Sequence, residues 1–235
     1  MKQHIEKELI HNPELFYVLG AILGDGYTYS WKDKKHEHFR VGLDVKNKIF
    51  ALKYAQKLSR GIGSKINACY YANKELWFVR LDNKELYLLV NKLRFSPNLL
   101  VSLINKNDKS RSRAINFIEG FFDADGCVKI INDSARKIPK ICLNFTSTDS
   151  NRIEVIRVLL KSYLGIKARY SNQGAYLSKD GFPRKKAYHL RIYKKEFVKR
   201  FLKKIQTIKL YDKKVPYVEK WMNNKWKGGP HPIPK

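Results

Sequence analysis

One short pattern occurs twice in the chain and constrains the fold more than any other feature. YVLGAILGDGYTY (residues 17–29) and IEGFFDADGCVKI (residues 118–130) each begin as an apolar, helix-like run and pass through Asp-Gly into a strand-like segment. Asp25 and Asp125, which end the two runs, lie 100 residues apart. One such run alone is more typical of a buried helix followed by a turn, because short motifs often match by chance. The repetition predicts a role for the acid in both halves.

Small residues recur within each run. They are four positions apart, Gly20 and Gly24 in the first run and Gly120 and Ala124 in the second. Residues four apart share a helix face, so two such helices can approach closely. Gly26 and Gly126 then suit the left-handed position that ends many helices. We therefore expect two packed helices that end side by side.

This packing places Asp25 and Asp125 at two helix C-termini. That end of a helix carries about half a negative charge, and two neighbouring carboxylates also repel each other. A shared proton or a bound cation would relieve both effects. Oxygen ligands favour a hard divalent ion such as Mg2+. Paired acids that hold such ions are the parts of a metal-assisted phosphodiester hydrolase.

The segments after each run also repeat. Residues 39–63 parallel residues 141–166 as a strand, an amphipathic helix and a Gly-Ile pair, and residues 76–86 parallel residues 187–197. Each half therefore reads as helix, two strands, helix, two strands and helix. The predicted fold class is α+β, with two pseudo-twofold αββαββα halves whose antiparallel sheets form a DNA-binding saddle.

The domain boundaries follow from this repeat. We expect a first half at residues 1–93, a linker at 94–111, a second half at 112–205 and a basic C-terminal tail at 206–235. Strands are expected near residues 27–31, 39–45, 65–71 and 75–81 of the first half. Phe39, Val41 and Leu43 alternate with polar residues, so one sheet face should pack under helices and the other should stay open.

The charge of the chain indicates its partner. The chain has 235 residues and contains 48 Lys and Arg against 21 Asp and Glu, which gives a net charge of +27. A basic excess spread along the whole sequence points to nucleic acid. An anionic membrane surface is the alternative, but no run is long or apolar enough to span a bilayer. Cys69, Cys127 and Cys142 show no spacing typical of a zinc site or a disulfide framework.

Polar residues on the open sheet faces are the candidate contacts to DNA bases. They are Tyr29, Trp31, Arg40, Asp44, Lys65, Asn67, Arg80, Lys129, Asn144, Arg169, His189 and Arg191. A two-stranded ribbon fits the major groove, and basic residues at the rims can hold phosphates. The rim candidates lie in or beside the hairpin tips: Lys34, Lys35, Arg136, Lys140, Arg184 and Lys185. For any one of these residues, a solvated surface side chain is the alternative.

The two runs carry a resemblance to a known family. VLGAILGDG (residues 18–26) and IEGFFDADG (residues 118–126) resemble the two motifs of a monomeric, double-motif LAGLIDADG homing endonuclease, encoded within an intron or an intein. The second copy keeps the terminal DADG. The first has Leu23 in place of the motif's earlier Asp, which is not the catalytic acid of the family. The resemblance extends over roughly residues 12–205.

The resemblance implies a mechanism and its residues. It makes Asp25 and Asp125 catalytic metal ligands, helped by the backbone carbonyls of Gly24 and Ala124, and it gives Lys46 the place of a lysine that supports the hydrolytic water. The second half has Ser-Thr-Asp at residues 147–149 instead, so Lys129 is the candidate for the missing charge. The two cleavage centres should therefore differ.

The implied activity is site-specific hydrolysis of one phosphodiester in each strand of a long asymmetric duplex, leaving short 3′ overhangs. The expected cofactor is Mg2+, with Mn2+ as a substitute and Ca2+ as an ion that binds without supporting cleavage.

Two other functional classes stay open. A maturase that binds intron RNA, or a DNA-binding regulator, would use the same scaffold without needing the acids. A generic basic RNA-binding protein would explain the charge but not the repeated Asp-Gly helix ends. The N-terminal residues lack the apolar region of a signal peptide, so we expect an intracellular protein, in the cytoplasm of a prokaryote or in an organelle.

Overall fold

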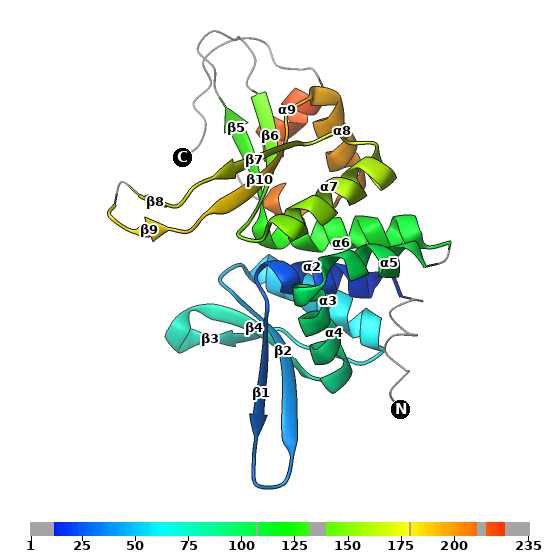
Figure 1. Cartoon of the computed structure of the whole chain (residues 1–235), viewed down its shortest axis with the longest axis vertical. Coiled ribbons are helices and arrows are strands. Elements are labelled where there is room, and N and C mark those ends of the chain that lie inside the picture. Colours follow the sequence, from blue (N-terminus) through cyan, green and yellow to red (C-terminus); the bar gives the residue numbers. More distant parts are fainter. Residues whose placement is uncertain (1–11, 107, 132–139, 179, 211–214, 224–235) are drawn as a thin grey trace. The chain divides into compact units, whose positions relative to one another are not determined.

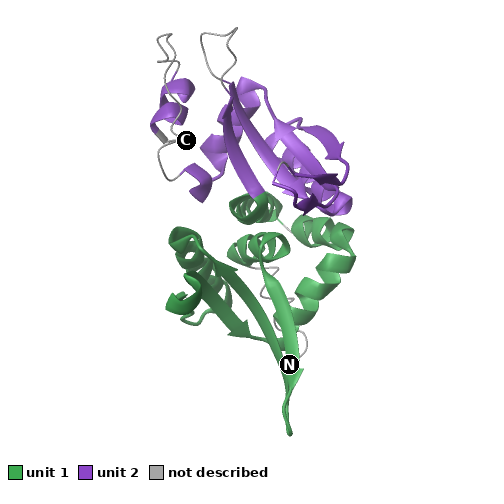
Figure 2. Cartoon of the chain, turned by 90° about the vertical axis from the view of Figure 1, so that its left-hand side faces the viewer, with its two compact units in different colours: residues 1–125 green, residues 126–235 purple. Residues whose placement is uncertain are grey.

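The computed structural model describes residues 12–106, 108–131, 140–178, 180–210 and 215–223. Figure 1 shows the helices and strands, and Figure 2 colours two compact units, residues 1–125 (unit 1) and 126–235 (unit 2). Among the described residues, no helix has both the length and the apolar character needed to cross a membrane.

Unit 1 alternates helices with antiparallel strands. Its elements are α2 (Glu14–Gly24), β1 (Tyr27–Lys32), β2 (Glu37–Val45), α3 (Lys48–Ile62), β3 (Cys69–Tyr71), the 3-10 helix η1 (Ala72–Lys74), β4 (Leu76–Asp82), α4 (Lys84–Phe95), α5 (Pro97–Asn105) and α6 (Ser110–Asp125). The Asn47 and Asn83 side chains cap the N-termini of α3 and α4 by accepting backbone N–H bonds of 3.0 and 2.8 Å.

The sheet of unit 1 has one buried and one open face. Its strand order is β1-β2-β4-β3. Val41, Leu43 and Val79 lie on the buried face, which α3 and α4 cover. The register pairs Gly42 of β2 with Tyr27 on one side and Arg80 on the other, so these residues share the open face. The alternation expected from residues 39–45 therefore places the polar residues on the open face.

Unit 2 repeats the same order of elements after α6. It contains β5 (Gly126–Ile131), β6 (Lys140–Ser147), α7 (Ser150–Leu164), β7 (Arg169–Gln173), β8 (Tyr176–Leu177), β9 (Pro183–Arg184), β10 (Ala187–Ile192), α8 (Lys195–Lys204), the 3-10 helix η2 (Ile208–Leu210) and α9 (Val215–Met222). The main sheet has the order β5-β6-β10-β7, and β8 and β9 pair as a separate ribbon. The added ribbon extends the hairpin between β7 and β10 (Figure 1).

The sheet of unit 2 is likewise two-sided. Leu143, Phe145 and Leu190 are fully buried, and the Phe145 ring meets the Phe201 ring of α8 edge-on at 5.9 Å between centroids. The opposite face carries Asn144 and Arg191, which are paired directly across β6 and β10. Each unit thus combines a helix-covered core with an open sheet face of polar side chains.

Helices α2 and α6 pack closely against each other in unit 1. A Cβ atom on Gly20 would overlap the carbonyl oxygen of Phe117 and lie 2.7 Å from the nitrogen of Phe121. A Cβ atom on Gly120 would overlap the carbonyl oxygen of Tyr17. The two backbones therefore touch where the sequence places its glycines, as the spacing of small residues predicts.

The α+β fold class and its antiparallel sheets are confirmed. The compact units divide after Asp125, so α6 clusters with unit 1, because it packs along α2. The stretch at residues 94–111, expected as a linker, contains α5 and the start of α6. Pro97 begins α5 at a position where proline loses no helical hydrogen bond.

Two local expectations are wrong. Among the described glycines, the positive φ angles belong to Gly63, Gly165 and Gly181, and neither Gly26 nor Gly126 is left-handed. Gly26 serves close approach instead, because a Cβ atom there would lie 2.6 Å from the Cα of Ile22 and 3.0 Å from the carbonyl oxygen of Gly42. Gly126 is already the first residue of strand β5.

The strand expected at residues 65–71 begins only at Cys69. The Ser59 hydroxyl accepts from the N–H of Ile66 at 2.8 Å, and its oxygen lies 3.1 Å from the Ile66 carbonyl oxygen and 2.7 Å from that of Ala55. These contacts hold the chain at Ile66 against the end of α3, so that part of the backbone does not join the sheet. Lys65 and Asn67 consequently lie in an exposed loop.

The glycine contact predicts a strong size limit. Gly20→Ala or Gly120→Ala should lower the free energy of unfolding by roughly 1–3 kcal/mol or more, as overpacking does, despite the better helix propensity of alanine. Urea unfolding measures this loss. Gly174→Ala is the matched control, because a Cβ atom on Gly174 meets nothing within 4 Å. Equal stability of all three variants would contradict the close backbone contact between α2 and α6.

Candidate functional site

The site is built on the adjacent ends of α2 and α6. A Cβ atom on Gly24 would overlap the Cβ of Ala124 and lie 3.4 Å from Oδ2 of Asp125. Asp25 follows Gly24 directly and is the C-cap of α2, with its N–H bonded to the carbonyl oxygen of Ala21 at 3.0 Å. The two acids therefore end the same helix pair side by side. Asp25 is exposed and Asp125 half-buried, so both are accessible from solvent.

The electrostatics of this place favour a cation. Each carboxylate lies at the negative end of a helix dipole, and the Asp125 carboxylate lies against the last turn of α2. The carbonyl groups of Gly24 and Ala124 belong to the last helical turns, where carbonyls point out of the helix end. Carboxylate and carbonyl oxygens are the donors that Mg2+ and Ca2+ prefer. The donor set therefore fits a hard divalent ion.

The described residues contain no cluster of three or more His, Cys, Asp or Glu side chains that could hold a metal ion. The pair of carboxylates at the helix ends would be a site of a different kind, since Mg2+ is usually bound through one or two carboxylates, keeps several waters and meets a substrate phosphate.

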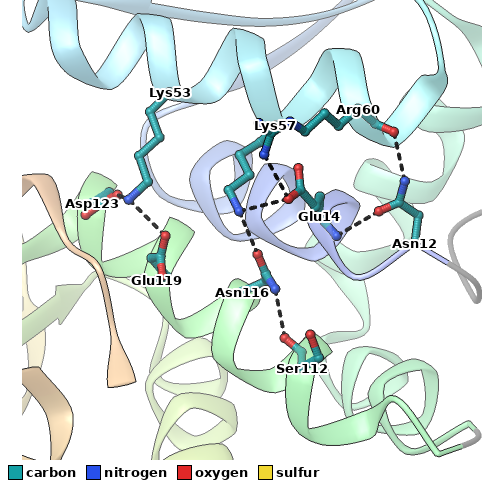
Figure 3. A network of polar contacts seen from close by, with 9 residues as sticks. All are labelled: Asn12, Glu14, Lys53, Lys57, Arg60, Ser112, Asn116, Glu119 and Asp123. Carbon is teal, nitrogen blue, oxygen red and sulfur yellow. Dashed lines mark hydrogen bonds and ion pairs between the residues drawn. The ribbon is translucent and has the colours of Figure 1, made fainter. Parts of the chain in front are cut away.

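A buried ionic cluster lies one turn before the acids (Figure 3). The Lys53 ammonium of α3 bonds Asp123 at 2.7 Å and Glu119 at 2.9 Å, both on α6. The Tyr17 hydroxyl of α2 donates to the same Asp123 carboxylate at 2.9 Å. Burial, and then the charge of Asp123, raise the pKa of Tyr17 well above its ordinary value. Asp123 thus joins α2, α3 and α6 two residues before Asp125.

A second set of contacts extends this cluster toward the start of α2 (Figure 3). Lys57 bonds the Glu14 carboxylate at 3.3 Å and the Asn116 amide oxygen at 3.2 Å. The Asn12 side chain accepts from the N–H of Glu14 and donates to the carbonyl of Arg60. These bonds join α3 to both motif helices over their length.

Sequence reasoning did not find the Lys53–Asp123 pair. Its signal is the asymmetry of the motifs, since Leu23 stands where the second copy has Asp123. The buried Arg113 at the start of α6 was also missed; its guanidinium donates to the carbonyls of Leu103, Ile104 and Lys106 at the end of α5. Burial lowers the pKa of Arg113 from its ordinary value.

The two candidate supporting lysines lie at different positions in the two units. Lys46 comes directly after β2 and is exposed. In the matching segment of unit 2, the Asp149 carboxylate caps α7 by accepting from the N–H of Asn151 at 2.9 Å. Lys129 is exposed on β5, opposite Cys142.

The open face of unit 1 brings together five of the predicted DNA contacts. Tyr29 stacks on Trp31 with ring centroids 5.6 Å apart. The Arg40 guanidinium lies over the Trp31 ring at 4.6 Å, and Arg80 bonds Asp44 at 3.2 Å. Their shared face matches the register of β1, β2 and β4.

The tip of the β1–β2 hairpin carries Lys34 and Lys35, which are exposed. Asp33 closes this turn: its carboxylate contacts the His38 ring at 2.8 Å and accepts from the backbone N–H groups of Lys35 and His36. The bond to His38, and then the two backbone bonds, lower the pKa of Asp33 to about 2.

The open face of unit 2 is built around His189. The Asn144 amide donates to Thr146 at 2.9 Å, and the Thr146 hydroxyl lies 3.2 Å from Nδ1 of His189. Burial, and then the charges of Arg191 and Lys129, lower the pKa of His189. Asn144 itself is only 3% exposed, so its amide lies beneath the surface of this face.

The other candidates of unit 2 lie farther out on its strands. Arg169 and Arg191 face each other across β7 and β10. Lys140 begins β6, with its ammonium over the Tyr193 ring at 4.8 Å. Arg184 and Lys185 are exposed at and just after β9. Arg136 lies outside the described residues.

Comparison with known proteins agrees with this geometry. The family model described as a LAGLIDADG-like domain matches residues 113–206. No sequence match to a curated protein was found. The resemblance is thus confirmed for residues 113–206, which contain the second motif.

Solved structures of the homing endonuclease I-DmoI are similar to most of the chain, across both units. Mesophilic variants of I-DmoI align with a TM-score of 0.55 and 21% identity, covering 83% of this chain and 90% of that one. I-DmoI in complex with DNA and Mn aligns at 0.53 and 22%, covering 83% and 96%. The complex with DNA and Ca aligns at 0.56 and 18%, covering 88% and 97%. The chain therefore has the LAGLIDADG endonuclease fold.

The ionic cluster predicts a large stability loss. Lys53→Met should lower the free energy of unfolding by about 3–5 kcal/mol, because it removes the cation that compensates the fully buried Asp123 carboxylate. Adding Asp123→Leu, the residue type found at Leu23, should recover much of that loss. Urea unfolding measures both. Lys57→Met is the control and should cost less, since Glu14 also pairs with Arg60 and is a quarter exposed.

The hairpin turn predicts an acidic titration. The folded pKa of Asp33 is depressed, so its contribution to hairpin stability is present above about pH 3.9, the ordinary value, and is lost as the pH falls through about 2. His38→Ala should raise the pKa toward the ordinary value, as measured by NMR titration of the carboxyl carbon. His36→Ala should leave it low, since only the backbone of His36 bonds Asp33.

Proposed function

We propose that this protein is a site-specific homing endonuclease. It binds a long asymmetric DNA duplex as a monomer and hydrolyses one phosphodiester in each strand, leaving short 3′ overhangs. The observation that carries the proposal is the pair of acids at the adjacent ends of α2 and α6, with the Asp125 carboxylate against the last turn of α2. A buried structural helix pair has no need of two accessible acids at its shared end.

The DNA contacts are supported by the character of the two sheets. Each unit carries an open face of polar and basic side chains over a helix-covered core. We assign one half of the DNA site to each open face, and the rim lysines and arginines to phosphates. The net charge of +27 supplies the electrostatic attraction for duplex DNA. The faces differ in composition, which suits an asymmetric target.

The catalytic roles follow from the donor set. Asp25 and Asp125 would hold divalent cations together with the carbonyls of Gly24 and Ala124. Bound Mg2+ would neutralise charge on the scissile phosphate and lower the pKa of water. Mn2+ should substitute, and Ca2+ should bind without supporting cleavage. We assign the Lys46 and Lys129 ammonium groups to orienting water in their respective halves.

The test is cleavage of supercoiled DNA that carries the intron-lacking allele of the host gene, with Mg2+ or with EDTA. Asp25→Asn and Asp125→Asn should each reduce double-strand cleavage by more than roughly 100-fold. Loss of a residue that only supports a metal ligand costs up to about 100-fold, and loss of the ligand itself should cost more. Binding of the same DNA should persist in both variants, because the phosphate and base contacts are elsewhere.

Asp108→Asn is the matched control, since this exposed acid precedes α6 at its opposite end. It should cleave like the unmodified protein. Tight binding without cleavage under any divalent ion would overturn the nuclease assignment and favour a maturase or a DNA-binding regulator.

A further inference from the structure

Two arginines on the open face of unit 1 are held in the same way. Arg40 donates to both oxygens of Asp82, from Nε at 2.6 Å and from NH2 at 2.9 Å. Its guanidinium lies over the Trp31 ring at 4.6 Å. The register places Arg40 and Asp82 directly opposite each other on β2 and β4. One edge and one face of the guanidinium are therefore occupied within the protein.

Arg80 repeats this arrangement with different partners. It donates from Nε to the Tyr27 hydroxyl at 3.0 Å and from NH2 to Asp44 at 3.2 Å, and it lies over the Phe78 ring at 4.4 Å. The Tyr27 hydroxyl donates in turn to Asp44 at 3.2 Å, which closes the ring of bonds. A Cβ atom on Gly42 would lie 2.6 Å from the Tyr27 oxygen, so a glycine there makes room for the tyrosine.

Both arginines use the same edge of the guanidinium for their protein partners. Nε and one side of NH2 are used, and no NH1 hydrogen bond of either arginine to another described residue is found. The side chains of Arg40 and Arg80 are 29% and 38% exposed. The outer edge of a guanidinium is a fork of parallel N–H groups, which matches the O6 and N7 acceptors of guanine in the major groove. Adenine presents a donor in place of O6 and would oppose the fork.

The carboxylates have a different task from the arginines. Asp44 and Asp82 already accept hydrogen bonds from arginine, so they are poor acceptors for a cytosine amino group. By fixing each guanidinium before DNA arrives, they reduce the side-chain entropy lost on binding.

The four described strands of the main sheet of unit 2 do not hold an arginine against a carboxylate of the same sheet. Strands β5, β6, β7 and β10 contain no aspartate or glutamate. Their open face carries Asn144, Thr146 and His189 in a hydrogen-bonded group whose members can donate or accept. Such groups accommodate more than one base edge. The two open faces thus differ in how strictly they can select bases.

We infer that Arg40 and Arg80 each select a guanine in the half of the DNA site bound by unit 1. Asp82, and Asp44 with Tyr27, act as positioning residues and not as DNA contacts. The inference rests on the proposed binding of duplex DNA. Arg80 is paired with Gly42, two residues along β2 from Arg40. That separation is roughly 7 Å along the strand, so the two guanines should lie about two base-pair steps apart.

The test is selection of bound sequences from a randomised duplex library by the full-length protein in EDTA, where binding is read without cleavage. The unmodified protein should enrich two guanines at this spacing. Arg40→Lys and Arg80→Lys keep the charge but remove the fork, so each should lower the preference for guanine at one position by about ten- to a hundredfold. Preferences elsewhere in the site should stay.

Two further variants separate the roles. Asp82→Asn should keep the guanine preference of Arg40 but weaken binding of the selected site, since a freed arginine must be ordered on binding. Arg169→Lys in unit 2 should leave both guanines selected. Thermal melts of every variant establish that the exposed substitutions leave the fold intact.

The outcomes distinguish this inference from the proposed function. If the enriched site contains no guanine whose selection depends on Arg40 or Arg80, the inference is overturned. The proposed binding of duplex DNA is then still supported. Equal loss of affinity for all sequences in the Arg→Lys variants also overturns it, because that result indicates phosphate contacts. Absence of any enriched duplex overturns the proposed function and the inference with it.

Discussion

The backbone contact between α2 and α6 is the constraint on which the site depends. Gly20 and Gly120 lie where a side chain would overlap the carbonyl of the facing helix. This approach brings the helix ends together and so places the Asp125 carboxylate against the last turn of α2. Two acids at two helix C-termini are unfavourable by themselves, and only the close packing of the helices makes them neighbours. The negative potential that makes this position unfavourable for two carboxylates also favours the binding of a divalent cation there.

The buried ions around Lys53 extend the consequences of that contact. A lysine from α3 compensates two carboxylates on α6, while a tyrosine from α2 bonds one of them. A buried ion pair is a weak source of net stability but costs much when one partner is removed. The Lys53–Asp123 pair therefore fixes α3 against the last turns of α6. Asp123 lies two residues before Asp125. The corresponding residue of the first motif, Leu23, forms no such ion pair.

The open faces show a second use of paired charges. On unit 1, carboxylates occupy one edge of Arg40 and Arg80 and leave the other edge toward solvent. On unit 2, an amide, a hydroxyl and an imidazole bond one another instead. The two arrangements lie on corresponding sheets of the two units. The backbone fold is therefore repeated, and the side chains make the two open faces different. An asymmetric set of side chains on a repeated scaffold would suit the asymmetric DNA site that we propose.

The sequence by itself determined the repeated order of elements, the packing of the motif helices and the positions of Asp25 and Asp125, because glycine spacing and strand alternation are local signals. It also placed Arg40, Asp44 and Arg80 on one face. It misjudged Gly26, whose role is to let the carbonyl of Gly42 approach, and the strand start near Ile66, which Ser59 delays. Only the tertiary structure decided that Lys53 pairs with Asp123, that Arg113 donates to the carbonyls at the end of α5, and that Asp44 and Asp82 form ion pairs with arginines. These pairs join residues of different elements, most of them far apart in the chain, and partner choice depends on distances that no local pattern carries.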